Sequence, residues 1–530
     1  MNDKPELAMT KRDLLSLIGK SAGATAMLMA MAPLGQAHAS TFKGPIKLEG
    51  DAKGKSVLIL GAGLAGMVSA LELSRAGYSV QVLEFNPKVG GRTWTLRGGD
   101  SYTELGGHTQ TVQFAPGNYL NPGPWRIPTD HGGVIHYCHE LGVALEPFQQ
   151  NNYNAYVHST SAFGGKPQRF KAIQADYHGH VAELLGKAVR QNALDEAVTA
   201  EDAEILLESL RGWGALDSNM QYVKGSASAT RRGWEKGPGG GLTAVPIPSE
   251  PLDTSTVLRS GLWRSLGSHL TNEHQQAIFQ PVGGMDQIAV GFEKAVGPMV
   301  RLNSKVTSIR QNDNGVTVEY LDTRSGDKLT AQADYCICTI PLSILAQIPM
   351  NVGGKMSAAI KAVPYGPSVK VGLEFKRRFW EQDEQIYGGI TSTDLPNSQI
   401  SYPSYGYGSK GPSVLLGAYV SNATAYELSS MRPEERVRRA LEWGAQIHPQ
   451  YRDEFIGGVS VAWHRVPWTL GCSGRWTEQA RAEHYNNLCE IDGRIVLAGE
   501  HASYIGAWQE GAVTSALDAI GRLHQRVQAA

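Results

Sequence analysis

The hydrophobic pattern is sharpest near the start of the chain. Residues 56–60 form a continuous apolar run with β-branched side chains, which is typical of a parallel strand buried on both faces. A glycine-rich turn at 61–66 follows, and residues 67–76 carry apolar side chains at helical spacing. A second apolar run at 80–83 ends at Glu84. The pattern predicts a strand, a tight turn, a helix and a second strand.

The glycines of this turn have the spacing of a dinucleotide site. Gly61 makes the tight turn, Gly63 lets the backbone approach a pyrophosphate, and Gly66 lets the helix pack on the sheet. Ala65 lies in the same turn, where the helix N-terminus would face the phosphates. Glu84 follows at the end of the second strand and can accept hydrogen bonds from ribose hydroxyls. An acid at this place disfavours a 2′-phosphate.

Three other stretches have recognisable patterns. Residues 368–375 alternate as a strand does, and Lys370 lies on the face opposite the apolar side chains, which by itself favours a solvent-exposed lysine. Residues 176–212 have the leucine spacing of amphipathic helices. The stretch 237–251 is rich in glycine and proline, and we interpret it as an exposed loop, with a lid or an oligomer contact as the alternatives.

Composition narrows the class of protein. The 530 residues include 49 basic and 50 acidic side chains, and a net charge of −1 gives no electrostatic case for binding nucleic acid. The length indicates two or three domains. The chain has 61 glycines, where average usage gives about 37, so we expect turns that approach a ligand closely.

The cysteines and histidines favour neither a disulfide scaffold nor a metal site. Five cysteines are an odd number, and no C-x-x-C pair occurs. His131, His136, Cys138 and His139 cluster in the sequence, but their spacing is poor for zinc. We expect buried cysteines and no bound metal.

Residues 1–39 have the order of a secretory signal peptide. A charged stretch with Lys11 and Arg12 precedes an apolar run at 22–32, and the tripeptide at 37–39 has the small residues of a cleavage site. The charged stretch also resembles a twin-arginine signal with lysine in place of the first arginine. The apolar run is too short to span a membrane, and the alternative is a helical anchor that stays attached. We expect export to the periplasm or the medium, with no membrane contact after cleavage.

A second glycine turn carries a resemblance to a known family. Residues 89–94 read Val-Gly-Gly-Arg-Thr-Trp, and they resemble the G-G-R motif that follows the ribose acid in the flavin-containing amine oxidase family. The resemblance implies that FAD is the cofactor, bound without a covalent bond, and that Gly91 and Arg92 lie near its pyrophosphate.

The resemblance continues to the C-terminus. Residues 282–286 resemble the family's G-G-M-D turn, and the strand after it implies a backbone contact between Val306 and the adenine. Residues 493–500 resemble the closing strand and the turn that contacts the flavin. The resemblance implies that Gly499 and Glu500 lie on the ribityl or pyrophosphate side.

The substrate is indicated by an arginine between prolines. Residues 122–128 resemble the G-x-M-R-[IL]-P segment of L-amino-acid oxidases, in which the arginine pairs with the substrate carboxylate. Arg126 holds that place here, and a guanidinium matches a carboxylate with two parallel hydrogen bonds. The resemblance implies that Tyr402 donates to the same carboxylate. The plain alternatives are a structural arginine and a packed strand tyrosine.

Three more residues receive roles from the resemblance. Lys370 would hold a water against the flavin, Trp508 would stand beside the flavin ring, and the Ala507 carbonyl would accept from the substrate amine. A lysine in such a place is partly desolvated, which lowers its pKa.

These motifs together predict an α/β fold, α+β overall, with a Rossmann-like FAD-binding domain, a mixed-sheet substrate domain and a helical insertion. The predicted FAD-binding domain combines residues 51–127, 276–345 and 485–530. The helical insertion is 128–275, and the substrate domain is 346–484.

The predicted activity is that of an FAD-dependent L-amino-acid oxidase. An L-amino acid and molecular oxygen would give a 2-oxo acid, ammonia and hydrogen peroxide, and the protein is a possible homo-oligomer. Three alternatives stay open at this point: an amine oxidase that does not recognise a carboxylate, a flavin monooxygenase that decarboxylates the amino acid to an amide, and a flavin protein without turnover.

Overall fold

The computed structural model describes residues 40–529, except 195–197, 243–244 and 276. The predicted signal segment 1–39 lies outside the described residues. Within them, no helix combines the length and the apolar character needed to cross a membrane.

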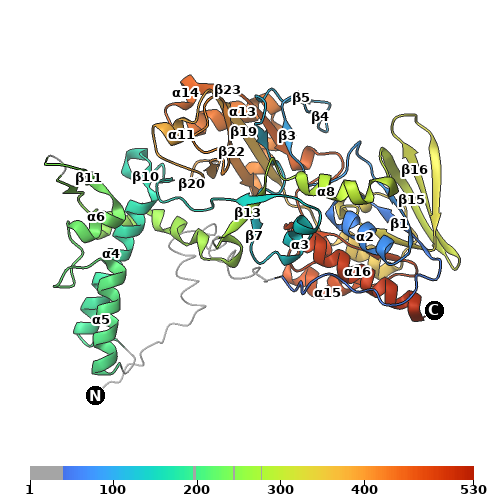
Figure 1. The fold of residues 1–530 in the computed structure, drawn as a ribbon, viewed down its shortest axis with the longest axis horizontal. Helices are drawn as coiled ribbons and strands as arrows, with labels where there is room; N and C mark the ends of the chain where they lie inside the picture. Colours follow the sequence, from blue (N-terminus) through green and yellow to red (C-terminus); the bar gives the residue numbers. More distant parts are fainter. Residues whose placement is uncertain (1–39, 195–197, 243–244, 276, 530) are drawn as a thin grey trace, which may run out of the picture.

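A parallel sheet lies at the centre of one end of the molecule (Figure 1). Its five strands, in the order β14-β2-β1-β18-β24, span Val300–Arg301, Ser79–Leu83, Ser56–Leu60, Tyr335–Cys338 and Ile495–Leu497. Every pairing in this sheet is parallel. The predicted strands at 56–60 and 80–83 are therefore confirmed, and they lie side by side. Strands β1, β18 and β24 are almost entirely buried, whereas β2 and β14, at one side of the sheet, are partly exposed.

Helices α2 (Leu64–Arg75), α8 (Gln287–Val296) and α16 (Gln509–Ala529) pack on this sheet in one apolar core. A three-stranded antiparallel sheet of β15 (Ser304–Asn312), β16 (Gly315–Asp322) and β17 (Lys328–Ala333) extends beside it. The turn between β1 and α2 and the start of β15 thus lie at the same end of the parallel strands, where ligands bind in open α/β sheets.

A second, mixed sheet of seven strands forms the other half of the body. Its order is β10-β9-β20-β21-β22-β19-β23, with the bounds Gln168–Arg169, Tyr156–His158, Ile390–Thr393, Gln399–Ser401, Ser413–Ser421, Ser368–Phe375 and Phe455–Ala462. Every residue of β19 is buried, so Lys370 does not face solvent. Elements on both sides of the sheet account for this burial, and an isolated alternating pattern does not reveal them.

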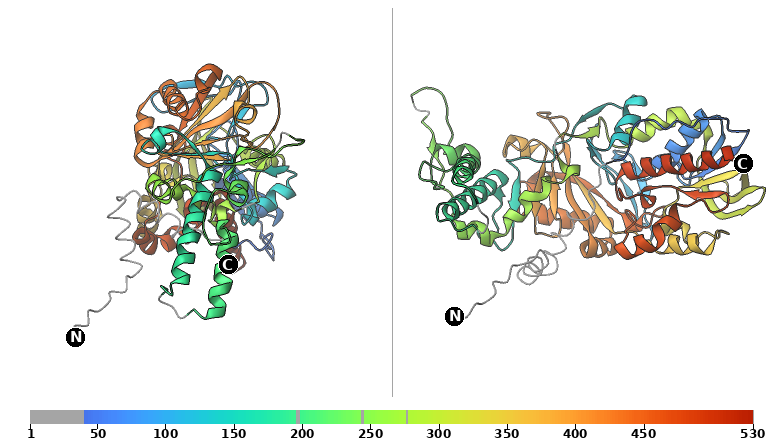
Figure 2. Two further views of the ribbon diagram at one scale, coloured as in Figure 1. Left: turned by 90° about the vertical axis from the view of Figure 1, so that its left-hand side faces the viewer. Right: turned by 90° about the horizontal axis from the view of Figure 1, so that it is seen from below.

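The helix α3 (Gly132–Glu140), at the start of the predicted insertion, packs in the apolar core of the parallel sheet. Four later helices of the insertion form an arm at one end of the molecule (Figures 1 and 2). They are α4 (Phe170–Arg190), α5 (Ala200–Gly214), α6 (Ser226–Arg232) and α7 (Thr254–Ser260). The first part of the segment 128–275 differs from the helical prediction, because β9 and β10 belong to the seven-stranded sheet. The domain boundaries themselves stay a prediction.

A fully buried ion pair ties the region before Arg126 to a helix that packs on the second sheet. Both oxygens of Glu104 accept from the Arg436 guanidinium at 2.8 Å, and neither side chain is exposed. Arg436 lies on α13 (Pro433–Gly444), and its remaining hydrogens reach the carbonyls of Leu428 and Met431. Removal of one partner of such a pair leaves an uncompensated buried charge.

We predict that Glu104→Ala lowers the free energy of unfolding by about 3–5 kcal/mol. Glu435→Ala is the matched control, because Glu435 forms an exposed pair with Arg438, and such pairs contribute about 1 kcal/mol or less. Thermal unfolding of both variants beside the parent measures the difference. Equal unfolding midpoints for the two variants would contradict this role of the buried pair.

Candidate functional site

A cavity of about 760 Å³ runs between the turn after β1 and the second sheet. Nine of the ten predicted cofactor residues line it: Gly61, Gly63, Ala65, Glu84, Gly91, Arg92, Val306, Gly499 and Glu500. The tenth, Gly66, lies behind the wall, in the first turn of α2. Arg126, Ala507 and Trp508 line the same cavity, so the structure brings these three predicted substrate residues to the predicted cofactor residues. Lys370 and Tyr402 are not among the lining residues.

The glycine turn has the shape that a pyrophosphate needs. Gly61 has φ +101°, which favours glycine, and a Cβ at Gly66 would lie 1.9 Å from the Gly61 carbonyl oxygen. A Cβ at Gly63, in contrast, would meet no protein atom within 4 Å, although Gly63 lines the cavity. The turn is therefore tight on the protein side and open on the cavity side. This open cradle fits a dinucleotide cofactor.

The Glu84 carboxylate is hydrogen-bonded to the backbone of the glycine turn. One carboxylate oxygen accepts from the Ala62 backbone N–H (2.7 Å), and the other accepts from the backbone and side-chain amides of Asn86 (both 2.8 Å). Burial raises the pKa of Glu84. The oxygen that accepts from Ala62 has one further lone pair, so the carboxylate can also accept from a ribose hydroxyl.

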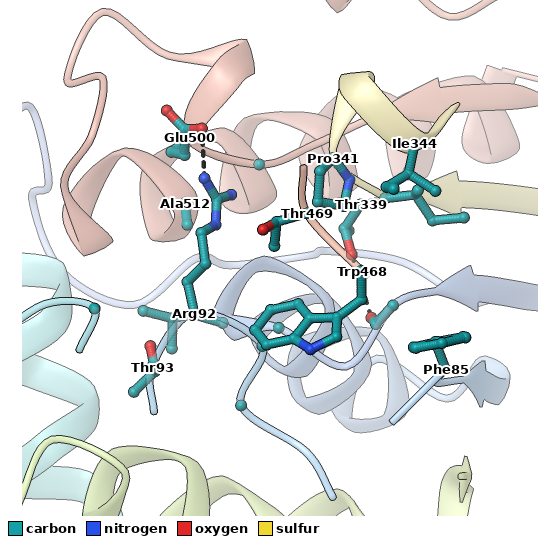
Figure 3. A pocket seen from close by; sticks show the side chains of 18 of the residues that line it. Phe85, Arg92, Thr93, Thr339, Pro341, Ile344, Trp468, Thr469, Glu500 and Ala512 are labelled. Carbon is teal, nitrogen blue, oxygen red and sulfur yellow. Dashed lines mark hydrogen bonds and ion pairs between the residues drawn. The ribbon is translucent and has the colours of Figure 1, made fainter. Parts of the chain in front are cut away.

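Arg92 and Glu500 form an ion pair across the cavity wall. Arg92 Nη1 donates to Glu500 Oε1 and to the Cys472 carbonyl, both at 2.8 Å, and Figure 3 shows the pair opposite Thr339, Pro341 and Ile344. Despite burial, the Arg92 charge lowers the pKa of Glu500, which also accepts from the Ala507 backbone N–H (3.1 Å). The pairing of Arg92 with Glu500 was not predicted; it joins the cofactor turn to the turn before α16.

Arg126 is a partly buried cation that lines the cavity. Its Nη1 donates to Gln150 Oε1 (2.7 Å), its Nη2 lies 2.8 Å from His274 Nε2, and its Nε has no partner. Within the described parts of residues 40–529, no carboxylate lies at ion-pair distance from it. The indoles of Trp125 and Trp508 lie 5.1 and 5.7 Å from the guanidinium carbon. Burial lowers the pKa of Arg126 to about 10, so it stays charged at neutral pH.

A small sheet brings the partners of Arg126 together. Strands β7 (Ile127–Pro128), β13 (Ile278–Pro281) and β8 (Leu145–Pro147) pair in the order β7-β13-β8. Arg126 precedes β7, His274 lies shortly before β13, and Gln150 follows β8. Sequence reasoning missed Gln150 and His274 because these neighbours come from segments far apart in the chain.

Lys370 lies beside the aromatic rings of Trp125 and Tyr419, which line the cavity. Its Nζ donates to the carbonyls of Gly123 (2.5 Å) and Asn121 (3.3 Å), and it lies 4.7 Å from the Trp125 ring and 4.6 Å from the Tyr419 ring. Burial, with a smaller effect of the Arg126 charge, lowers the pKa of Lys370 to about 7. The lysine can therefore gain or lose a proton near neutral pH.

The structure does not bring Tyr402 to this cavity, contrary to the expectation for a carboxylate partner. Its hydroxyl bonds to Thr391 Oγ1 (2.8 Å) and His448 Nε2 (2.6 Å), inside the second sheet. The tyrosine that lines the cavity is Tyr419, which is paired with Lys370 across β22 and β19. Strand register decides which tyrosine faces Arg126. Tyr419 could have been found from the sequence only by first identifying residues 413–421 as the antiparallel partner strand of 368–375.

Ala507 adopts φ +66°, a left-handed conformation that favours glycine. Its N–H is held by Glu500, and the next residue, Trp508, packs edge-on against His131 with 5.0 Å between ring centroids. The backbone strain at Ala507 turns the chain sharply between Glu500 and Trp508, so that both line the cavity.

Comparisons with known proteins agree with this geometry. Residues 64–523 match the family described as flavin containing amine oxidoreductase. The L-amino-acid oxidase of Siganus canaliculatus is 26% identical over 477 residues, which cover 89% of this chain and 85% of the relative. The flavin-dependent L-tryptophan oxidase RebO of Lentzea aerocolonigenes is 27% identical over 491 residues, with 88% and 97% covered.

Among solved structures, cyclohexylamine oxidase from Brevibacterium oxydans superposes with a TM-score of 0.60. The superposition covers 90% of this chain and all of that one, at 16% sequence identity. At such an identity the likeness concerns the fold: a parallel cofactor sheet joined to a mixed sheet.

Two glycine variants of the turn at 61–66 should lose different properties: one loses stability, and the other loses FAD binding. Gly66→Ala places a methyl group against the Gly61 carbonyl, so the protein loses folded yield and thermal stability. Gly63→Ala meets no protein atom and sits in extended backbone (φ −72°, ψ 179°), so it folds as the parent does but binds FAD at least about tenfold more weakly. The flavin-to-protein ratio and the midpoint of the flavin-free protein measure both effects. Normal flavin content in Gly63→Ala would contradict the assignment of this turn.

Proposed function

The chain belongs to the flavin containing amine oxidoreductase family, and on that premise we propose that it is an FAD-dependent L-amino-acid oxidase. The reaction takes an L-amino acid, oxygen and water to a 2-oxo acid, ammonia and hydrogen peroxide. The observation that carries the proposal is Arg126, a partly buried cation in the cavity. It hydrogen-bonds to Gln150 and His274 and forms no ion pair within the described residues, although Glu273 also acts on it electrostatically.

A partly buried charge without an ion-pair partner is unfavourable, and the cost falls when an anion binds. An α-carboxylate is the anion that the substrate class of these relatives offers, and its two oxygens match the guanidinium. The aromatic rings of Trp125 and Trp508 keep water from competing for the same hydrogens. An amine without a carboxylate gains nothing from Arg126. This difference favours an amino-acid oxidase over a simple amine oxidase.

The residues of the cofactor turn fit FAD, held without a covalent bond. When bound, FAD supplies the two-electron oxidation of the bond between Cα and nitrogen. The thiol of Cys472 lines the cavity, and burial raises its pKa, so the sulfur stays protonated and is a poor nucleophile at neutral pH.

The chain's own residues orient the substrate. Arg126 fixes the carboxylate, Trp508 limits where the rest of the molecule lies, and the Ala507 carbonyl accepts from the amine. With three points fixed, the Cα–H of the L-enantiomer has one direction. We assign Lys370 to hold a water or a proton beside the reacting carbon, because two backbone carbonyls fix its Nζ and its pKa is about 7.

Arg126→Ala tests the proposal. Hydrogen bonds between charged groups contribute about 1.5–3 kcal/mol each, so the loss of two lowers kcat/KM for L-amino acids by roughly 10²–10⁴-fold. Peroxide release measures the rates, with decarboxylated amines as the parallel substrates. Arg522→Ala, which alters an exposed pair on α16, is the matched control and retains the parent's rates. An Arg126→Ala protein that oxidises L-amino acids as well as the parent would overturn the assignment.

Lys370 predicts a pH dependence. Above about pH 7 the amine is neutral and can accept a proton, so the anaerobic rate of flavin reduction rises as pH passes through that value. Lys370→Met removes this inflection and slows reduction by about 10²-fold, the usual contribution of a proton-transfer group. Rapid mixing at several pH values measures both. The same inflection in Lys370→Met would assign the ionisation to another group.

A further inference from the structure

Residues 40–53 lie along α16 from its first turn to its last. At the start, the Ser40 hydroxyl donates to Glu510 Oε1. Further along, the Glu49 carbonyl accepts from His524 Nε2 (2.9 Å), and the Asp51 carbonyl accepts from Gln528 Nε2 (2.6 Å). Contacts along the whole helix therefore fix where Ser40 lies. It is also the first residue after the cleavage site predicted at 37–39.

Glu510, where Ser40 docks, is a completely buried carboxylate. It accepts from the backbone N–H groups of Gly133 (2.9 Å) and Val134 (2.8 Å), which begin α3 (Gly132–Glu140). Both carboxylate oxygens of nearby Asp130 are buried without a hydrogen-bond partner. Burial raises the pKa of each carboxyl group, and the charge of Asp130 raises that of Glu510 further.

No cation in the described part of the chain pairs with either carboxylate. Among their neighbours, His131 is kept neutral, because burial lowers its pKa to about 3. His136, on α3, faces Glu140 at 3.1 Å and packs against Phe42. Two adjacent buried carboxylates without a counter-ion are unfavourable. The place beside Ser40 is therefore suited to a positive charge.

We propose that cleavage of the chain after Ala39 supplies this charge. Hydrolysis of the bond between Ala39 and Ser40 by a signal-cleaving protease consumes one water and leaves a carboxylate on Ala39 and an amine on Ser40. The amine takes up a proton below about pH 8, as free α-amino groups do. The new ammonium is attached to the residue whose hydroxyl already contacts Glu510, so rotation of Ser40 brings it to the carboxylate.

The ion pair would stabilise the position of Trp508 in the cavity in two ways. Glu510 comes two residues after Trp508 in the sequence, and it holds the start of α3. The residue before α3 is His131, whose ring packs against the Trp508 indole. Glu510 is thus a positioning residue. The mature N-terminus would stabilise the position of the Trp508 ring beside Arg126, and cleavage of the signal segment would complete the folded enzyme.

The test compares FAD-loaded proteins that differ by one residue at the N-terminus. One begins at Ser40, and the other carries a single glycine before Ser40, which moves the ammonium away. We expect the protein that begins at Ser40 to have an apparent Tm higher by about 2 °C or more at pH 7. The ammonium loses its proton as pH rises, so the advantage should disappear above about pH 10.

The same pair of proteins is then made with Glu510→Gln, which should abolish the difference, and with Asp518→Asn, an exposed control on α16 that should retain it. If Glu510→Gln does not fold, Asp130→Asn takes its place and should reduce the difference. Equal midpoints for the two N-termini, or a difference that survives Glu510→Gln, would overturn the proposal. So would an exported mature protein whose first residue is not Ser40.

Discussion

The cavity owes its chemistry to the Arg126 guanidinium, which is partly buried beside two indole rings and forms no ion pair within the described residues. Arg126 is held by Gln150 and His274, and its Nε has no partner. The fold maintains this charge through the small sheet β7-β13-β8, which brings three distant segments together. The net charge of the chain is only −1, so the overall field does not select an anion. Selectivity would come from this local cation.

The cofactor end of the cavity is governed by close approach between backbone segments. Gly66 and Gly61 leave no room for a side chain between α2 and β1, whereas Gly63 leaves the cavity side open. Arg92 lies in the adjacent glycine turn at 89–94, and its ion pair with Glu500 joins that turn to Ala507, whose N–H bonds to the same carboxylate group. The two ends of the cavity are therefore connected through Glu500. A ligand that orders one end would also restrain the other.

The sequence predicted those parts of the site that depend on the spacing of residues within one short segment. The glycine turn and Glu84 could be assigned because they lie within one strand–helix–strand unit of the sequence. Arg126 could be identified because it lies between two prolines. The partners of these residues depend on contacts between distant segments. The expectation for Tyr402 was wrong in its location because strand register, which a single strand does not reveal, places Tyr419 opposite Lys370. The pair of Glu104 and Arg436 could not be predicted because its partners lie 332 positions apart in the sequence.

The central claim is that the cavity recognises a carboxylate beside an oxidisable amine. Anaerobic addition of L-amino acids to the FAD-loaded protein, in parallel with the amines that lack only the carboxylate, tests it most directly. We predict that L-amino acids bleach the visible flavin band and that the band persists with the matching amines. Bleaching by the amines at an equal rate, or by neither set of compounds, would contradict it.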